Sequence, residues 1–275
     1  MVSVESPPVE RATAPAPRVK LLKTKVSRRT AWILRVASVA VPFALWWAVS
    51  GSGVVPDRFL PAPPQVWAAF TDMVASGDLQ NDLLASLGRI GAGFGLAVLV
   101  SVPLGFLMGT VGWAQPLFEP IIGILRYLPA SAFIPLLIIW LGIGETSKIA
   151  LLVLGVVFFN TLMTADVVRQ VPRRLLDVSA TLGAGRARVA ARVVFPHSLP
   201  GILDALRVNA AVAYNLVVVA ELIAATSGLG YRITRAQRFL QTDKIFAILI
   251  VIGLIGLTID VTLRLVRARV GRWSV

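Results

Sequence analysis

The sequence predicts an all-α membrane protein with about six transmembrane helices. Hydrophobic residues make up 56% of its 275 residues, charged residues make up 15%, and the mean hydropathy is +0.78. Several apolar runs are long enough to cross a bilayer, which takes about 20 helical residues. We therefore expect a transmembrane domain over residues 30–275, behind an N-terminal tail at 1–29.

The tail is rich in proline and in basic residues, and we expect it to be disordered. The apolar run behind it is long and lacks a small-residue cleavage site. We therefore interpret that run as a retained first span at about 31–50 rather than as a signal peptide.

Residues 51–82 form an acidic connection with four aspartates and a single Arg58. A short helix is expected to begin at Pro63 within it, with an apolar side formed by Val66, Trp67, Phe70 and Val74. Such a helix is predicted to lie at the membrane interface.

The second span, at about 83–109, contains two pairs of glycines that are four residues apart. They are Gly91 with Gly95 and Gly105 with Gly109. Small residues at this spacing let helices approach closely, so both pairs predict helix packing within the chain.

The third span, at about 117–141, is predicted to be broken by Pro129 and Pro135. A break frees backbone groups that protein or water must satisfy, which favours a cavity lining over a lipid-facing position. The fourth span runs from about 147 to 166 and contains Asn160.

Residues 167–198 are the longest polar interruption in the second half of the chain and predict two short helices. The first has Leu175, Leu176, Ser179 and Leu182 on one face, and the second carries Arg186, Arg188 and Arg192. Gly183 and Gly185 allow a bend between them, and Pro196 is expected to end the second helix. From the residues alone, a docking surface and a connector lying on anionic lipid both remain open.

The fifth and sixth spans are expected at about 200–225 and 245–263. Lys and Arg number seven in the tail, six from residue 169 to 192, and four after the last span. Positive residues mark the cytoplasmic side, so both termini and the 167–198 loop are predicted to be cytoplasmic.

Polar residues inside the spans are candidates for a translocation path, namely Arg126, Asn160, Asn209, Tyr214 and Asn215. Arg126 and Asn209 each lie nine residues into a span, or about 13 Å, and Asn160 falls at a similar depth. The alternatives are a structural or snorkelling role for Arg126 and hydrogen bonding between helices for the asparagines.

Glu221 lies about 31 Å along the fifth span, near its outer mouth. The external arginines are its expected partners, and we predict an outer gate formed by Glu221 and Arg232. Gly228 and Gly230 are expected to form a simple turn.

Several classes of function are not expected. The net charge of +13 is concentrated at the edges of apolar runs, which favours membrane lipid over nucleic acid as a partner. The chain has no cysteine and one histidine, His197, so no metal site is expected. Residues 142–148 only faintly resemble a phosphate loop, because Ser147 occupies the place of a required glycine. No catalytic residues are predicted.

The basic segment also carries a family resemblance. Asp177-Val178-Ser179, followed by Gly183 and by Val194-Phe195-Pro196, resembles the EAA loop of bacterial ABC importer permeases. Asp177 keeps the acidic residue of that loop, whereas Val178 and Ser179 replace both of its alanines.

Further motifs resemble the nitrate/sulfonate/taurine/bicarbonate branch of these permeases, over roughly residues 58–273. They are Leu60-Pro61-Ala62-Pro63, Leu125-Arg126-Tyr127-Leu128-Pro129, Ile134-Pro135-Leu136, Ala220-Glu221-Leu222-Ile223 and the glycine-containing run from Ser227 to Tyr231.

The resemblance implies a homodimeric permease of a binding-protein-dependent importer in the bacterial plasma membrane. Two ATP-binding-cassette subunits would bind ATP and Mg and dock on the helix pair, so the chain itself is not an enzyme. The implied coupling residues are Asp177, Ser179, Gly183, Arg186, Arg188 and Pro196. An external solute-binding protein would deliver a small oxyanion such as nitrate, a sulfonate or taurine.

The competing prediction is a stand-alone secondary transporter driven by an ion gradient. It would need titratable groups at mid-membrane, ideally in two related halves. Asp204 and Asp260 lie towards the cytoplasmic ends of their spans, and no inverted repeat is visible. A passive anchor would leave the broken third span and the membrane asparagines unexplained.

Overall fold

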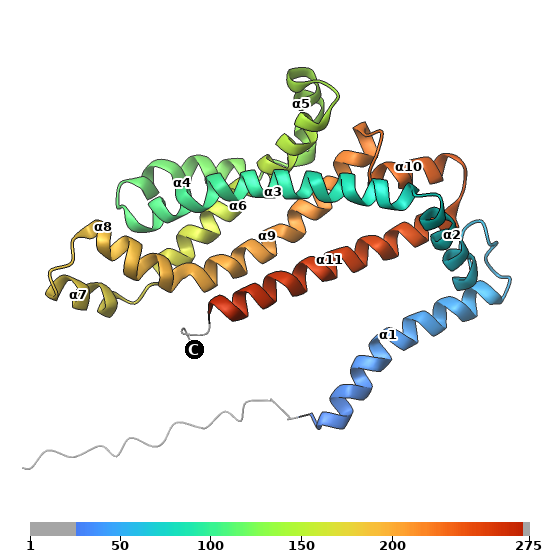
Figure 1. The fold of residues 1–275 in the computed structure, drawn as a ribbon, viewed down its shortest axis with the longest axis horizontal. Coiled ribbons are helices and arrows are strands. Elements are labelled where there is room, and N and C mark those ends of the chain that lie inside the picture. The colour runs from blue at the N-terminus through green and yellow to red at the C-terminus, as the bar shows by residue number, and fades with distance from the viewer. Residues whose placement is uncertain (1–25, 272–275) are drawn as a thin grey trace, which may run out of the picture. The chain divides into compact units, whose positions relative to one another are not determined.

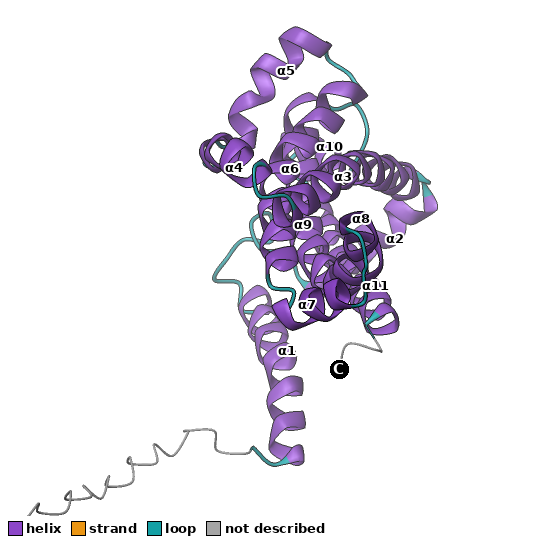
Figure 2. Cartoon of the chain, turned by 90° about the vertical axis from the view of Figure 1, so that its left-hand side faces the viewer, coloured by secondary structure: helices purple, strands orange, loops and turns teal. Residues whose placement is uncertain are grey.

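A computed structural model describes residues 26–271, and helices are the only regular secondary structure in that range (Figure 2). The helices are α1 (Arg28–Gly51), α2 (Pro63–Ala75), α3 (Asp78–Thr110), α4 (Ala114–Leu125), α5 (Ile134–Leu141), α6 (Glu145–Arg169), α7 (Arg173–Thr181), α8 (Arg186–Val189), α9 (Phe195–Ala224), α10 (Leu229–Arg238) and α11 (Thr242–Val270). The prediction of a disordered tail at 1–29 falls almost wholly outside the described residues.

The chain divides into two units, Met1–Ala48 and Val49–Val275. Most of α1 belongs to the first unit, and it is a long apolar helix whose side chains are nearly all exposed. The second unit contains all the other helices and every site described below.

Within the described range, five helices are long and apolar enough to cross a membrane: α1, α3, α6, the continuous helix Arg186–Ile223 that joins α8 to α9, and α11. The count rises to six if α4 and the segment Ala130–Leu141, which meet at 79°, form one broken span. The break falls at Pro129, as expected. Pro135 does not break the span, because it lies in the first turn of α5, where proline is tolerated.

In the second unit, α3 packs along α6, α6 along α9, and α9 along α11. Figure 1 shows this bundle with α7 and α8 at one end and α2 and α10 at the other. Its centre is a cluster of apolar side chains from four helices, including Ile90, Leu152, Tyr214 and Val217. The bundle therefore has an apolar centre and different short helices at its two ends.

The two glycine pairs of α3 differ in their surroundings. A Cβ at Gly105 would lie 2.4 Å from the carbonyl oxygen of Thr161, and one at Gly109 would lie 2.6 Å from Val168. Gly91 and Gly95 have nothing within 4 Å of such a Cβ. Only the second pair therefore brings α3 against α6.

The predicted apolar side of α2 is divided between two faces. Val66 is buried together with Ala69 and Met73, and α2 packs on α11 and α3. Trp67 and Val74 point outward and are exposed, and Trp67 stacks on Phe70 with ring centroids 5.4 Å apart. The helix therefore has a protein-facing stripe that the sequence pattern did not separate.

The segment after α6 forms two short helices that bend at Gly183, whose φ is +74°. Leu176 and Val189 anchor the pair on a cluster that includes Val168 and Ile202. The expectation that Pro196 ends the second helix is wrong. The chain stays helical from α8 through a π turn at Ala190–Val194 into α9, and Pro196 directly follows that turn, where the shifted backbone bonding accommodates its missing N–H.

Candidate functional site

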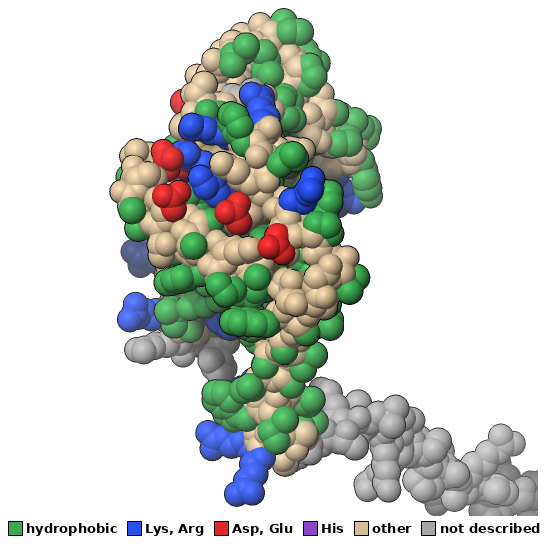
Figure 3. Space-filling model, turned by 90° about the vertical axis from the view of Figure 1, so that its right-hand side faces the viewer, with side chains coloured by type: hydrophobic (Ala, Val, Ile, Leu, Met, Phe, Trp, Pro, Cys, Tyr) green, Lys and Arg blue, Asp and Glu red, His purple; other side chains and the backbone are tan. Residues whose placement is uncertain are grey.

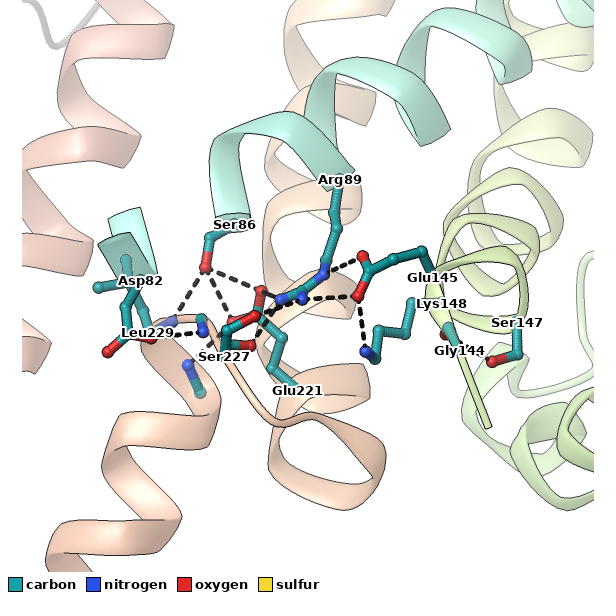
Figure 4. A network of polar contacts seen from close by, with 12 residues as sticks. Asp82, Ser86, Arg89, Gly144, Glu145, Ser147, Lys148, Glu221, Ser227 and Leu229 are labelled. Carbon is teal, nitrogen blue, oxygen red and sulfur yellow. Dashed lines mark hydrogen bonds and ion pairs between the residues drawn. The ribbon is translucent and has the colours of Figure 1, made fainter. Parts of the chain in front are cut away.

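A polar stripe runs along the buried side of α3 near its first residues. Asp82, Ser86 and Arg89 follow one another at spacings of four and three residues, so they share one face of the helix. All three side chains are buried against α9, α10 and the start of α6 (Figure 4).

Arg89 is the centre of this arrangement, and its side chain is only 4% exposed. It makes a two-pronged ion pair with Glu145, with distances of 2.5 Å from Nε and 2.8 Å from Nη2. Nη1 donates to Oε1 of Glu221 at 2.6 Å and to the carbonyl oxygen of Ser227 at 2.8 Å. Nη2 also donates to the Ser227 hydroxyl at 3.0 Å. The planar guanidinium thus uses all five of its N–H donors.

Glu221, near the C-terminal end of α9, accepts hydrogen bonds from two other helices, α3 and α10. Besides Arg89, it receives the Ser86 hydroxyl at 2.8 Å and the backbone N–H of Gly230 at 2.9 Å. Asp82 accepts the N–H of Gly228 at 2.7 Å, and Ser86 accepts the N–H of Leu229 at 3.0 Å. The first free N–H groups of α10 are therefore satisfied by side chains of α3 and α9, which also place negative charge at the positive helix end.

Gly228 and Gly230 are more than the simple turn that was expected. A Cβ at Gly228 would lie 2.4 Å from the carboxyl carbon of Glu221, and the residue has φ +115°. A Cβ at Gly230 would lie 2.5 Å from the carbonyl oxygen of Val218. Gly230 is required because α10 approaches the backbone of α9 too closely for a side chain, and Gly228 is required because of its positive φ and the Glu221 carboxylate beside it.

Arg232 completes the arrangement from α10. Its Nε donates to Asp82 at 2.5 Å and its Nη1 to Asp78 at 2.7 Å. Burial by itself lowers the pKa of Arg232, but the bonds to the two aspartates outweigh that effect and raise the pKa above its usual value. We call Asp82, Ser86, Arg89, Glu145, Glu221 and Arg232 the α10 clamp, because together they hold the start of α10 on α3, α6 and α9.

The predicted pairing of Glu221 with an external arginine is wrong. Glu221 and Arg232 belong to one cluster, but the cation bound to Glu221 is Arg89 and the acids bound to Arg232 are Asp78 and Asp82. Arg89, Ser86 and Lys148 were not predicted as site residues from the sequence. Lys148 donates to Glu145 at 3.0 Å. The spacing of Asp82, Ser86 and Arg89 within an otherwise apolar helix was the available signal.

Asn160 and Asn209 meet in the middle of the bundle, as their depths suggested. Asn209 Nδ2 lies 3.3 Å from Asn160 Oδ1, and Asn160 Nδ2 donates to the Ser101 hydroxyl at 2.6 Å. All three side chains are buried, so they link α3, α6 and α9. This geometry favours the structural alternative, in which the asparagines bond helices together.

Arg126 does not join that layer. Its Nη2 donates to the Tyr127 hydroxyl at 3.0 Å, and its guanidinium lies 4.9 Å from the centre of the Tyr127 ring. The Nε atom is buried and has no hydrogen-bond partner within residues 26–271. Arg126 lines a cavity of about 250 Å³ at the break between α4 and α5, whose wall includes Pro129, Phe133, Gly155, Phe158, Phe159, Val212 and Leu216.

The two remaining candidates for the path lie on α9. Tyr214 is buried in the core, and its hydroxyl donates to the Ile252 carbonyl oxygen of α11 at 2.7 Å. Asn215 is exposed on the surface of the chain. The structure therefore leaves Asn215 accessible and gives Tyr214 a packing contact.

The residues predicted for coupling lie at the opposite end from the α10 clamp. Asp177, Gly183, Arg186 and Arg188 are exposed, whereas Ser179 and Pro196 are half-buried. Ser179 donates its hydroxyl to the Leu175 carbonyl oxygen of its own helix at 2.6 Å. Val178 and Leu182 leave apolar surface uncovered beside these charges. Such a surface can receive a partner protein.

Apolar spans packed in one bundle, with an uncovered helix pair at one end and a buried ionic cluster at the other, define a multi-pass membrane protein. Within residues 26–271, no group of three or more His, Asp or Glu residues could hold a metal ion. The family model described as binding-protein-dependent transport system inner membrane component matches residues 101–272.

The sequence is 35% identical over 260 residues to the taurine transport system permease protein TauC of Escherichia coli, covering 90% of this chain and 94% of that one. It is 33% identical over 246 residues to a putative aliphatic sulfonates transport permease protein, SsuC of Bacillus subtilis, covering 90% and 89%. The fold matches the inward-facing MetNI methionine ABC transporter with a TM-score of 0.60 at 18% identity, over 76% of this chain and 99% of that one.

The chain therefore belongs to the family of binding-protein-dependent ABC transporter permeases, in its taurine and sulfonate group. It is an inner-membrane transport component. Permeases of this family are not enzymes themselves, and ATP hydrolysis belongs to a separate subunit.

Proposed function

We propose that this chain forms, with a second copy of itself, the translocation path of an importer for a small oxyanion of the sulfonate class. The observation that carries the proposal is Arg126, a cation in the cavity at the break of a membrane span. Two relatives have names that refer to taurine and to aliphatic sulfonates, both of which contain a sulfonate group.

The chemistry of the cavity supports an anionic cargo. Its volume of about 250 Å³ suits a small molecule, and most of its wall is apolar, so few other groups compete for the charge. The Nε donor of Arg126 is buried and unused, although a buried donor without a partner costs roughly 1–3 kcal/mol. A sulfonate presents three oxygens, and a guanidinium binds such a group through two parallel hydrogen bonds.

We further propose that two ATPase subunits dock on α7 and α8. Arg186, Arg188 and Asp177 supply charge there, while Val178 and Leu182 supply apolar contact. Because α8 continues into α9 without a break in the helix, a displacement of α8 reaches the wall of the cavity at Val212. ATP binding would thus move the path, and hydrolysis would reset it.

The orientation that follows from the charge distribution puts α7, α8 and both termini in the cytoplasm. The α10 clamp then lies on the outer side, where an external binding protein delivers the cargo. The carboxylates of the clamp do not favour the alternative of a proton-driven transporter. Glu221 and Asp82 are each bonded to an arginine and to a backbone N–H group, so both serve to hold α10 in place.

The test is uptake of radiolabelled taurine and of a linear alkanesulfonate into proteoliposomes that contain the permease, its ATPase, ATP and the binding protein. We expect Arg126→Gln to assemble and to keep basal ATP hydrolysis, but to lose most of its uptake. Arg126→Lys should restore only part of it, because a point charge replaces a planar fork. Arg58→Gln, which removes an exposed arginine from the connection before α2, is the matched control and should transport normally.

Equal loss of complex yield and of uptake in Arg126→Gln would make Arg126 a structural residue. Full uptake by that variant would show that no charge is needed in the cavity. Uptake that persists without ATP and follows an imposed proton gradient would replace the importer with a secondary transporter.

A further inference from the structure

The turn between α10 and α11 contains a backbone conformation that its sequence does not favour. Leu240 has φ +53° and is the one non-glycine residue with positive φ among residues 26–271. The N–H of Gln241 donates to the Ala236 carbonyl oxygen at 2.9 Å, and the N–H of Leu240 donates to that of Gln237 at 3.1 Å. This pair of bonds ends the helix with a left-handed residue, a position where glycine is usual because it has no Cβ.

The side chain of Leu240 gains nothing from this position within its own unit. It is 73% exposed, and its neighbour Phe239 is 68% exposed. Glycine at position 240 would relieve the backbone and remove apolar surface from solvent, so the fold alone favours glycine over leucine. We take this as a sign that the two side chains contact something outside the chain.

Beside these residues lies a polar cavity of about 230 Å³. Its wall consists of Asp72, Met73, Asp78, Arg232, Arg235, Ala236, Phe239, Gln241 and Lys244. Lys244 pairs with Asp72 at 3.6 Å, and Arg232 is bound to Asp78. Arg235 and Arg238 are exposed and form no ion pair with another described residue. The surroundings of the turn are thus polar and carry unpaired positive charge, and Figure 3 shows charged side chains gathered on this end of the molecule.

The turn is also firmly connected to the spans. The α10 clamp holds the first N–H groups of α10 on Glu221 of α9 and on α3, and Thr242 of α11 donates to the Arg58 carbonyl oxygen at 2.8 Å. A force applied at residue 240 therefore reaches the helices that wall the path, rather than being absorbed by a loose loop.

We propose that Arg235, Arg238, Phe239 and Leu240 form the surface on which the external binding protein docks, an inference that rests on the proposed function. The partner would offer an apolar recess for Phe239 and Leu240, edged by carboxylates that pair with Arg235 and Arg238. We favour a protein over the outer lipid leaflet because charged side chains line the cavity next to the two apolar residues.

The test uses the reconstituted permease–ATPase complex and the binding protein that supports uptake by the unaltered complex. The readout is the concentration of binding protein that gives half-maximal stimulation of ATP hydrolysis. We expect Leu240→Gly to raise it at least tenfold, while the melting temperature of the complex stays the same or increases. Arg235→Glu combined with Arg238→Glu should raise it by a similar factor, and salt should lower the value for this variant because it screens the new repulsion, whereas salt should raise it for the unaltered complex.

Val54→Gly is the matched control, because Val54 is also highly exposed but lies in the connection before α2, and its half-maximal concentration should not change. An unchanged value for Leu240→Gly overturns the docking surface while the proposed function stands. If no binding protein stimulates or supports uptake by the unaltered complex, the proposed function fails and the docking surface with it.

A second measurement separates protein from lipid. The chain has no cysteine, so Leu240→Cys can carry a single environment-sensitive fluorophore. A blue shift of its emission only when binding protein is added supports the proposal. A blue shift in liposomes without binding protein would place the side chain in lipid and overturn it.

Discussion

Glu221→Gln removes the buried negative charge of the α10 clamp while keeping the shape of the side chain. The carboxylate is fully buried and accepts bonds from Arg89, Ser86 and the N–H of Gly230. An amide has one oxygen for these donors, and its own N–H₂ group must then face another donor. The substitution therefore leaves the charge of Arg89 only partly compensated.

The magnitude follows from the burial of the two carboxylates that share Arg89. Breaking a buried ion pair from one side costs about 3–5 kcal/mol, and we expect the lower end, about 3 kcal/mol, because Glu145 remains bound. Glu145→Gln removes an acid that is 56% exposed, so water compensates much of the lost charge and we expect a smaller loss, about 1 kcal/mol. At about 2–4 °C per kcal/mol for a chain of this size, the melting temperature should fall by about 6–12 °C in the first variant and by at most about 4 °C in the second.

The assay is the thermal transition of the purified permease in one detergent, followed for both variants at the same protein concentration. Both substitutions act on the same guanidinium, so their difference compares the buried carboxylate of Glu221 with the half-exposed carboxylate of Glu145, which also pairs with Lys148. Equal shifts would refute the reasoning that the buried carboxylate dominates. A larger shift for Glu145→Gln would show that the link from α3 to α6 matters more than the link to α9.

Three further predictions follow from backbone contacts and exposure. Gly105→Ala should lower the thermal transition by several degrees because its methyl group would meet backbone 2.4 Å away, whereas Gly95→Ala on the same helix should be neutral or stabilising; equal effects would refute the assigned packing face. Gly183→Val should cost about 1–2 kcal/mol in local backbone strain, and should reduce both ATPase co-purification and transport while membrane insertion stays normal. A cysteine at the exposed Ser76 should react with a membrane-impermeant thiol reagent in intact spheroplasts, and one at the exposed Ala187 should not; the reverse pattern would invert the proposed orientation.

Much of the fold was accessible from local sequence patterns. The apolar runs set the number of spans, Pro129 marked the broken one, and Gly183 marked the bend between two short helices. These features depend on residues a few positions apart, since hydropathy, proline and glycine act on the backbone where they occur. Pro196 was expected to end a helix and does not, because the π turn directly before it accommodates the missing N–H.

Residue contacts were decided by packing between distant parts of the chain. Arg89 and Glu221 are 132 positions apart, and neither sequence neighbourhood identifies the other. The same holds for Gly105, which packs on α6, and Gly95, which does not, although both occur in similar glycine pairs. A helical pattern specifies which residues share a face, but the rotation and depth of that face are set by the helices packed against it. For this protein, the sequence by itself determined the long apolar helices, and only the tertiary structure decided which buried charges meet, because that pairing depends on how the helices pack.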